Sequence, residues 1–237
     1  MEAQLQAVNE SPAPTVVEEH DADGNVLLRS AMASGVLHGP LEQFWPGGQL
    51  AMQANFENGK LHGPMTLYDA DGALVQRSAF QRGLAHGVVE TYVHGRRVMA
   101  QTMAEGIACG PSLSYDEAGQ VTARLSLQSG QIEGPAAFFH EGRQVRNSVY
   151  RGGLLEGESV DLDAEGQVVQ RCSYRANLLH GSLRRYWPNG ALMEEVLYHD
   201  GVPVGVPVRF NAQGGRLGNA EAAPALMERI KRLLRGE

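Results

Sequence analysis

Four histidines recur at one position of a repeated motif and are the first candidates for chemistry in this sequence. Each precedes a glycine in Gly-x-x-His-Gly or Asn-x-x-His-Gly: His38, His62, His86 and His180. A zinc ion holds nitrogen ligands at about 2.1 Å. Equivalent residues of adjacent hairpins would lie two strands apart, about 9.5 Å. We therefore predict no metal site in this histidine ladder and expect a packing or hydrogen-bonding role near a turn.

Other arrangements of functional side chains are incomplete. Asp161, Asp163 and Glu165 alternate like the first ligands of a calcium loop, but the twelfth position, which needs glutamate, is Cys172. The glycine-rich turns lead into expected strands rather than helices, so they do not form a phosphate-binding loop. No Ser-His-Asp arrangement is recognisable. We expect a protein with no catalytic activity and no cofactor.

The element that positions these residues is a repeat of 23 or 24 residues marked by glycine. The motif Gly-x-x-x-Gly occurs eight times, starting at Gly35, Gly59, Gly83, Gly106, Gly130, Gly153, Asn177 (in place of glycine) and Gly201. A second series keeps the same spacing: Gly24, Gly48, Gly72, Gly95, Gly119, Gly142, Gly166, Gly190 and Gly214. A fixed period of this length indicates one structural unit stacked along an axis.

Each repeat is predicted to be a β-hairpin. The segment Asp69–Gly72 (Asp-Ala-Asp-Gly) is a turn signal between two short apolar-containing runs, and Gly59 and Gly83 mark turns at the other end. A helical repeat is disfavoured because glycine makes up 29 of 237 residues. The predicted fold is all-β: an elongated single-layer antiparallel sheet of repeated hairpins over residues 15–218.

Large side chains recur at two fixed strand positions and should form ladders. The fifth residue after the second glycine of each motif is Phe44, Tyr68, Tyr92, Tyr115, Phe139, Leu162, Tyr186 or Phe210. The third residue before the first glycine is Met32, Phe56, Phe80, Met103, Leu127, Tyr150, Tyr174 or Tyr198. Positions facing away from the second ladder vary more: Gln53, Arg77, Ala100, Arg124, Asn147, Arg171 and Glu195. Because alternate strand residues share a face, one face should be semi-apolar and the other solvated.

The two ends differ in character from the repeats. Residues 1–14 are expected to be a flexible lead-in. Residues 219–237 predict an amphipathic helix, in which Leu226, Ile230 and Leu233 share one face. We expect this helix to cap the last hairpin; contact with a partner or with a membrane surface is the alternative.

Charge and cysteine usage favour a cytoplasmic protein with a protein partner. The net charge is −7, and residues 1–59 hold eight acidic residues against one basic residue, Arg29. This negative charge disfavours nucleic acid as a partner and suits a basic protein partner. The alternative is that acidic ends only aid solubility. Cys109 and Cys172 lie too far apart in the expected array for a disulfide, and neither a signal peptide nor a membrane span is recognisable. The 18 arginines against two lysines hint at a GC-rich bacterial genome.

The repeat resembles a known family. Asn58–Gly72 resembles a MORN repeat (membrane occupation and recognition nexus), and Tyr186–Gly201 is similar to the variant in the bacterial YwqK-like antitoxin family. The resemblance covers residues 15–216 and implies protein binding, lipid-associated scaffolding or neutralisation of a toxin. The leading expectation is an antitoxin or immunity protein that occludes its toxin, and the alternative is a scaffold or membrane-associated interaction protein.

The predicted partner-binding surface is the first aromatic ladder with two nearby carboxylates. It comprises Glu42, Phe44, Tyr68, Glu90, Tyr92, Tyr115 and Phe139. Glu42 and Glu90 stand two residues before Phe44 and Tyr92, so each pair should share a strand face. Aromatic anchors beside charge are typical of interaction hot spots. The alternative is that these rings pack only against neighbouring hairpins.

The repeat also predicts the dimensions of the protein. We expect about 16 to 18 strands with a rise of about 4.8 Å each, hence a length on the order of 75–85 Å. Small-angle X-ray scattering should report an elongated particle. The profile of a compact sphere of the same mass would contradict this architecture.

Overall fold

The computed structural model describes residues 13–218, and this part of the chain is entirely β, with 21 strands and no helix. Contacts divide the chain into two compact units between Gly119 and Gln120, which we call unit 1 and unit 2 and describe separately. The prediction of an all-β antiparallel fold is confirmed. Most of the lead-in predicted for residues 1–14, and the helical cap predicted for residues 219–237, lie outside the described residues.

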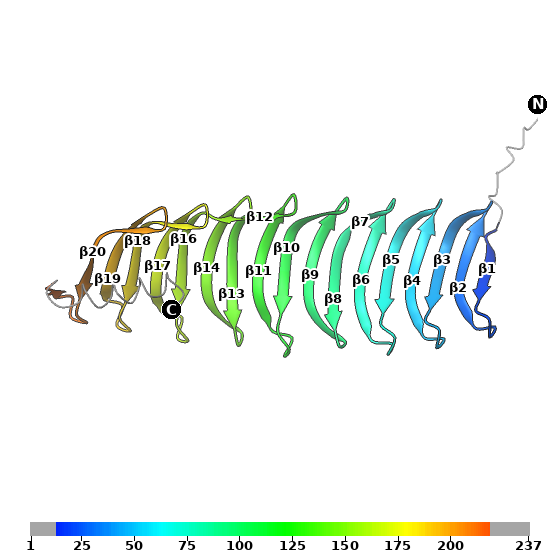
Figure 1. Cartoon of the computed structure of the whole chain (residues 1–237), viewed down its shortest axis with the longest axis horizontal. Coiled ribbons are helices and arrows are strands. Elements are labelled where there is room, and N and C mark those ends of the chain that lie inside the picture. Colours follow the sequence, from blue (N-terminus) through cyan, green and yellow to red (C-terminus); the bar gives the residue numbers. More distant parts are fainter. Residues whose placement is uncertain (1–12, 219–237) are drawn as a thin grey trace, which may run out of the picture. The chain divides into compact units, whose positions relative to one another are not determined.

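Unit 1 is an antiparallel meander in which each strand pairs with the next along the chain (Figure 1). Its strands are β1 (Thr15–His20), β2 (Val26–Ala33), β3 (Val36–Phe44), β4 (Leu50–Glu57), β5 (Lys60–Tyr68), β6 (Leu74–Gln81), β7 (Leu84–Ala85), β8 (Gly87–Val93), β9 (Arg96–Ala104) and β10 (Ile107–Tyr115). Strands β7 and β8 both pair with β6, because they are two parts of one interrupted strand.

Unit 2 is built in the same way. Its strands are β11 (Val121–Gln128), β12 (Gln131–Ile132), β13 (Gly134–His140), β14 (Arg143–Arg151), β15 (Leu154–Leu155), β16 (Gly157–Leu162), β17 (Val168–Arg175), β18 (Leu178–Tyr186), β19 (Leu192–His199), β20 (Val202–Phe210) and β21 (Arg216–Leu217). Interrupted strands and the short β21 explain why the count exceeds the predicted 16 to 18. Among the described residues, 17 strands have six residues or more, and the other four have two.

The first glycine of each motif closes a two-residue turn. Asn58 and Gly59 both have positive φ, 50° and 76°, and a turn of this kind matches the natural twist of the two strands it joins. Glycine adopts this conformation without steric cost, and asparagine tolerates it better than most other residues. Asn177 can therefore replace the glycine in one motif, where its φ is 69°.

The second glycine series closes the opposite ends of the hairpins, as predicted for Asp69–Gly72. The Gly72 amide donates to the Asp69 carbonyl at 3.0 Å, and the Asp69 amide donates to the Ala73 carbonyl at 2.9 Å. Oδ1 of Asp69 also accepts bonds from the amides of Asp71 and Ala73 at 3.1 and 2.8 Å. The aspartate therefore organises its own turn.

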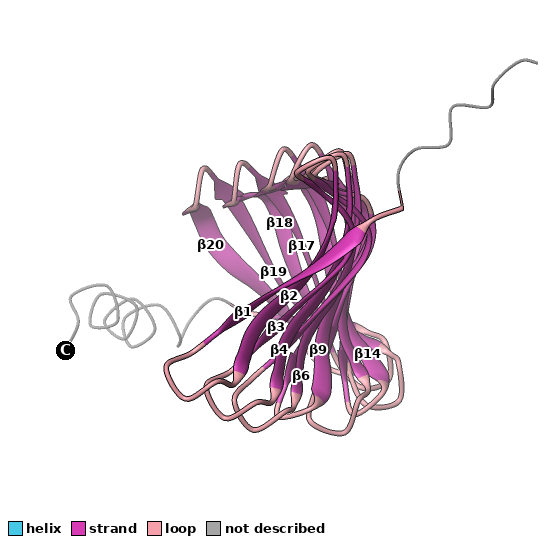
Figure 2. Cartoon of the chain, turned by 90° about the vertical axis from the view of Figure 1, so that its right-hand side faces the viewer, coloured by secondary structure: helices cyan, strands magenta, loops and turns pink. Residues whose placement is uncertain are grey.

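The second glycine of each motif lies at a bulge that bends the strand. In β5 the pairing jumps from Leu61 to Met65 while β4 advances by only two residues. Gly63 lies within this bulge at a φ of 89°, a conformation that residues with a β-carbon rarely adopt. Bulges increase local twist and bend the strand that carries them, and Figure 2 shows curved strands.

Mostly small side chains form the core, and they line one face of each unit, which we call the packed face. In unit 1 the central row of this face is Ser30, Leu41, Ala54, Met65 and Ser78. In unit 2 it is Ala136, Ser148, Ser159, Cys172, Leu183 and Val196. All of these except Met65 are buried, yet no large side chain is fully buried among the described residues. Within residues 13–218, no second layer covers either face of the sheet.

The opposite face, which we call the open face, is more solvated. Four of the variable positions assigned to it from the sequence are exposed: Gln53, Arg77, Arg124 and Asn147. Ala100 is buried at 8% exposure, because it lies opposite Glu90 on one side and Leu113 on the other. The expected difference between the two faces is therefore present but incomplete.

The bulge glycines allow a matched test of backbone strain. Gly39→Ala and Gly87→Ala change the same repeat position, and both place a β-carbon at positive φ, 110° and 93°. This conformation costs about 1–2 kcal/mol for an ordinary residue. At residue 39 the added carbon would also lie 3.0 Å from Cβ of Ala31, whereas residue 87 has nothing within 4 Å. Thermal denaturation should show the larger loss for Gly39→Ala, and equal losses would contradict this account of the bulge.

Candidate functional site

The position of the repeated histidine joins neighbouring repeats by hydrogen bonds. Nδ1 of His38 accepts a bond from the Asn58 amide at 3.5 Å, in the turn of the next repeat. Where glutamate replaces histidine, Oε2 of Glu133 accepts a bond from the Gly152 amide at 2.7 Å. The expected hydrogen-bonding role near a turn is therefore present at His38 and at the glutamate that replaces histidine, since imidazole and carboxylate serve the same acceptor function. It is not found at every copy, because Nδ1 of His62 makes no hydrogen bond to the next turn and faces Glu57 at 3.1 Å.

The predicted carboxylate Glu90 lies at the centre of a polar cluster on β8 and β9. Nη1 of Arg97 donates to its Oε1 at 2.7 Å, and the Tyr92 hydroxyl donates to its Oε2 at 2.9 Å. These bonds, with that of Arg97 contributing most, hold the pKa of Glu90 below its ordinary value. Glu90 and Tyr92 therefore share a strand face, as their spacing predicted.

Glu42 is also paired rather than isolated. Nη1 of Arg29 lies 3.1 Å from its Oε2, and the same guanidinium pairs with Glu18 at 2.8 Å. The sequence predicts that these carboxylates add charge beside the aromatic ladder. The structure instead places an arginine on each of them, so the surface presents ion pairs.

Arginines also stack on most of the predicted ladder. Guanidinium carbons lie 4.4 to 5.9 Å from ring centroids in four pairs: Arg29–Phe44, Arg77–Tyr92, Arg97–Tyr115 and Arg124–Phe139. These distances fall within the range of favourable cation–π contact. These arginines are not among the predicted site residues. The sequence pattern assigns Arg77 and Arg124 to the variable, solvated face, and Arg29 occupies the equivalent position of its own repeat.

Tyr68, the remaining ring of the predicted set, lies at a hollow. Phe44, Trp45 and Tyr68 line an open depression of about 430 Å³ together with Met52 and Leu67. Nε1 of Trp45 donates to the Tyr68 carbonyl at 3.3 Å, which joins one repeat to the next. Large apolar side chains are thus half-exposed around this depression.

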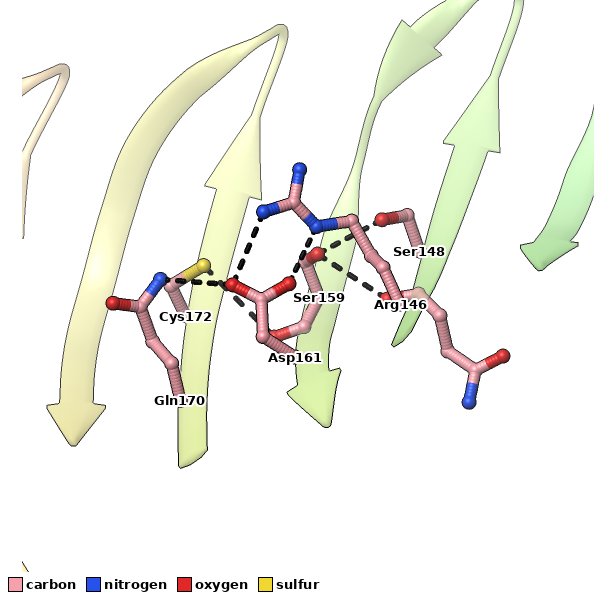
Figure 3. Close-up of polar contacts among 7 residues, drawn as sticks. Arg146, Ser148, Ser159, Asp161, Gln170 and Cys172 are labelled. Carbon is pink, nitrogen blue, oxygen red and sulfur yellow. Dashed lines mark hydrogen bonds and ion pairs between the residues drawn. The ribbon is translucent and has the colours of Figure 1, made fainter. Parts of the chain in front are cut away.

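A second polar row, absent from the predicted site, runs across the packed face of unit 2. Its members stand directly opposite one another on successive strands: Arg146, Asp161, Gln170, Arg185, Glu194 and Arg209. Arg146 donates two bonds to Asp161, and Gln170 donates to the same carboxylate at 3.2 Å (Figure 3). Glu194 is 9% exposed. It is held between Arg185 at 3.4 Å and Arg209 at 2.9 Å.

Beyond Glu19 of β1, which stands opposite Leu28, the same row of unit 1 carries no charge. Its members are Leu28, Gln43, Met52, Leu67, Gln76, Thr91 and Met99. In both units these are the fourth residues after a glycine of either the bulge or the hairpin turn. The charged row is therefore visible in the sequence at every fourth residue after these glycines, next to the large rings at the fifth residue.

Aromatic side chains from the second ladder border the charged row. Tyr150, Tyr174 and Arg146 line an open hollow of about 490 Å³ with Ser148 and Ser159 at its floor. The two serine hydroxyls are 2.8 Å apart and buried. Cys172, on the same face, is a free thiol whose pKa is raised by burial. The hollow could accept a polar group, but no predicted site residue contributes to it.

Comparison with known proteins identifies the repeat type. A family model described as "MORN repeat variant" matches residues 37–58 and 179–200. The chain carries MORN-type repeats. Each matched segment contains a tryptophan that bonds to the following repeat, Trp45 as described above and Trp187 to the Phe210 carbonyl at 3.0 Å. The shared Trp-Pro turn therefore has the same structural role in both.

Beyond this match, the comparisons add little to the MORN-type assignment. No curated protein matches the chain. Among solved structures, the crystal structure of TarM is 13% identical, with a TM-score of 0.30 over 40% of this chain and 19% of that chain. This chain thus spans less than a fifth of the TarM chain, and the likeness carries no argument about fold or function. None of the described residues belongs to a helix long and apolar enough to cross a membrane.

Tyr174 gives a pH test of the hollow. Burial is the main cause that raises its pKa from 10.0 to about 12. The folded state therefore holds this proton more tightly than the unfolded state, and the associated stability is lost as pH rises from about 10 toward 12. Tyr174→Phe removes the group, so its melting temperature should fall less over this interval, measured relative to its own value at pH 8. Equal falls in the wild type and the variant would contradict the buried environment.

Proposed function

We propose that this MORN-type protein is a non-catalytic protein-binding module whose partner binds along the first aromatic ladder. The observation that carries the proposal is the repeated stacking of arginine on Phe44, Tyr92 and Tyr115 in unit 1, and unit 2 repeats this contact at Phe139. Tyrosine and arginine are enriched at interaction hot spots. Arg29 and Arg97 keep 45% and 43% of their side chains exposed while they stack, so both remain accessible to a partner.

The mechanism of this module is occlusion. Backbone pairing between strands already fixes the surface, so a partner meets a preformed scaffold and less ordering entropy is lost on binding. Stacking and ion pairs hold the long arginine side chains in place before the partner arrives. Binding along the ladder covers the partner's surface over several repeats without a chemical step.

We further propose that the partner is a protein toxin, and that the module is a bacterial, cytoplasmic antitoxin or immunity protein. The resemblance of Tyr186–Gly201 to the YwqK-like antitoxin family supports this role. Charge supports it too: residues 13–59 hold six acidic side chains and one arginine. Only two of the six, Glu18 and Glu42, pair with that arginine. The remaining negative charge would accelerate association with a basic toxin.

The ladder can be tested by charge reversal with a matched control. Glu42→Arg with Glu90→Arg breaks two ion pairs beside the ladder, and Glu158→Arg with Glu195→Arg breaks two other exposed ion pairs, with Arg171 and Arg184 in unit 2, outside the predicted surface. Exposed pairs contribute about 0–1 kcal/mol each, so both variants should stay folded by circular dichroism. We expect the first variant to lose its partner and the second to keep it. Undiminished binding by the first variant would move the interface away from the ladder.

The toxin role needs its own measurement. The gene adjacent to the one for this chain is expressed from an inducible promoter, with and without this protein, and growth is followed. Arrested growth that the wild type rescues and the Glu42/Glu90 variant does not would support an antitoxin. A harmless neighbour, together with co-sedimentation of the protein with anionic liposomes, would contradict it and favour the membrane-associated scaffold.

A further inference from the structure

Two histidines and an aspartate converge where β18, β19 and the following turn meet. His180 lies in β18, His199 ends β19, and Asp200 is the first turn residue, with a φ of 49°. Nδ1 of His180 lies 3.2 Å from Oδ1 of Asp200, and Nδ1 of His199 lies 3.4 Å from its Oδ2. The two imidazole centroids are 4.9 Å apart. We propose that His180, His199 and Asp200 form a binding site for a divalent metal ion of the zinc type.

The geometry needs little adjustment to hold such an ion. One nitrogen of each ring and one carboxylate oxygen all lie within 4.8 Å of one another. Tetrahedral zinc with bonds of about 2.0–2.1 Å places its ligand atoms roughly 3.3 Å apart. His180 is half-buried while His199 and Asp200 are exposed, so small side-chain rotations of the two exposed residues can close the site.

The donor set also selects the class of ion. Two imidazoles and one carboxylate suit zinc and its neighbours, whereas calcium and magnesium prefer oxygen ligands. Three protein ligands leave the fourth position to water. The wide spacing that separates equivalent histidines of adjacent hairpins does not separate these ligands. His199 and Asp200 lie at the end of the neighbouring strand and in its turn, and they do not occupy an equivalent position two strands away.

Arg175 competes with the ion for the carboxylate. Its Nη2 lies 2.6 Å from Oδ1 of Asp200, and this bond is the main cause that keeps the pKa of Asp200 below its ordinary value. A metal ion would use Oδ2, the oxygen that faces His199, or displace Arg175 from Oδ1.

The chain offers an internal control for this cluster. His38, Glu57 and Asn58 occupy the same positions one hundred and forty-two residues earlier, and the Asn58 amide bonds to His38 as the Asp200 amide bonds to His180, both at 3.5 Å. Glutamate replaces one histidine and asparagine replaces the aspartate. This second cluster keeps the contact between repeats, and Nδ1 of His62 lies 3.1 Å from Oε2 of Glu57. Among the described residues, however, only His180, His199 and Asp200 bring three ligand atoms within 4.8 Å of one another, so the second cluster should bind zinc poorly.

Zinc titration of the untagged full chain tests the proposal, with a chromophoric chelator as competitor and Co²⁺ absorption as a report of coordination. We expect one zinc ion per chain. His199→Ala should weaken binding by at least about tenfold, and His38→Ala should leave it unchanged. Arg175→Gln should tighten it about fivefold, since a competing charge is removed from an exposed site.

Zinc should also raise the melting temperature of the wild type and of His38→Ala, but not that of His199→Ala. Melting without metal checks that each variant is folded. The absence of saturable one-to-one binding would overturn the proposal. So would an unchanged affinity of the folded His199→Ala variant, or an equal loss in His38→Ala.

Discussion

Hydrogen bonds from most of the turns at the first motif glycine to the preceding repeat are the interactions on which the rest of the structure depends. The Gly59 amide donates to the Leu37 carbonyl at 2.8 Å, and the Asn58 amide donates to His38. Because the described sheet has no second layer, these bonds and strand pairing must fix the register that a core would otherwise fix. Both turn amides reach back to the earlier repeat in a conformation with positive φ. Glycine or asparagine in the turn and an acceptor before the bulge therefore act together to join one repeat to the next.

This dependence explains how much of the fold could be predicted from sequence. Positive φ restricts residue choice so strongly that the glycine series alone gives the period, the hairpins and both kinds of turn. The interruption between β7 and β8 could not be predicted, because it arises from the local geometry of the bulge: His86 lies outside both strands although its amide still donates to the Ala79 carbonyl of β6 at 2.8 Å. The division into two units likewise leaves no break in the glycine spacing at Gly119.

The candidate site was predictable in its rings but not in its charges. Ring positions follow from the period, so Phe44 and Tyr92 could be placed on one ladder. Their arginine partners could not, since Arg97 reaches Glu90 and Tyr115 across two different strand pairings. A bulge lies at the end of β8, where the partner of Tyr92 is Arg97 and that of Thr91 is Met99. Such an offset changes which side chains meet, and it depends on turn length, which differs between repeats.

Because turns and backbone hydrogen bonds fix the register, the architecture does not depend on the side chains of the surface. Backbone groups and a few glycines define the register, so positions such as the fourth residue after each glycine are free to vary. Unit 1 places Met52 and Leu67 there, while unit 2 places Asp161 and Arg185 on an equivalent part of its packed face. An uncharged row favours apolar contact, whereas a row of alternating ion pairs favours polar contact and resists dehydration. One repeat therefore supports two surfaces of different specificity without any change of fold.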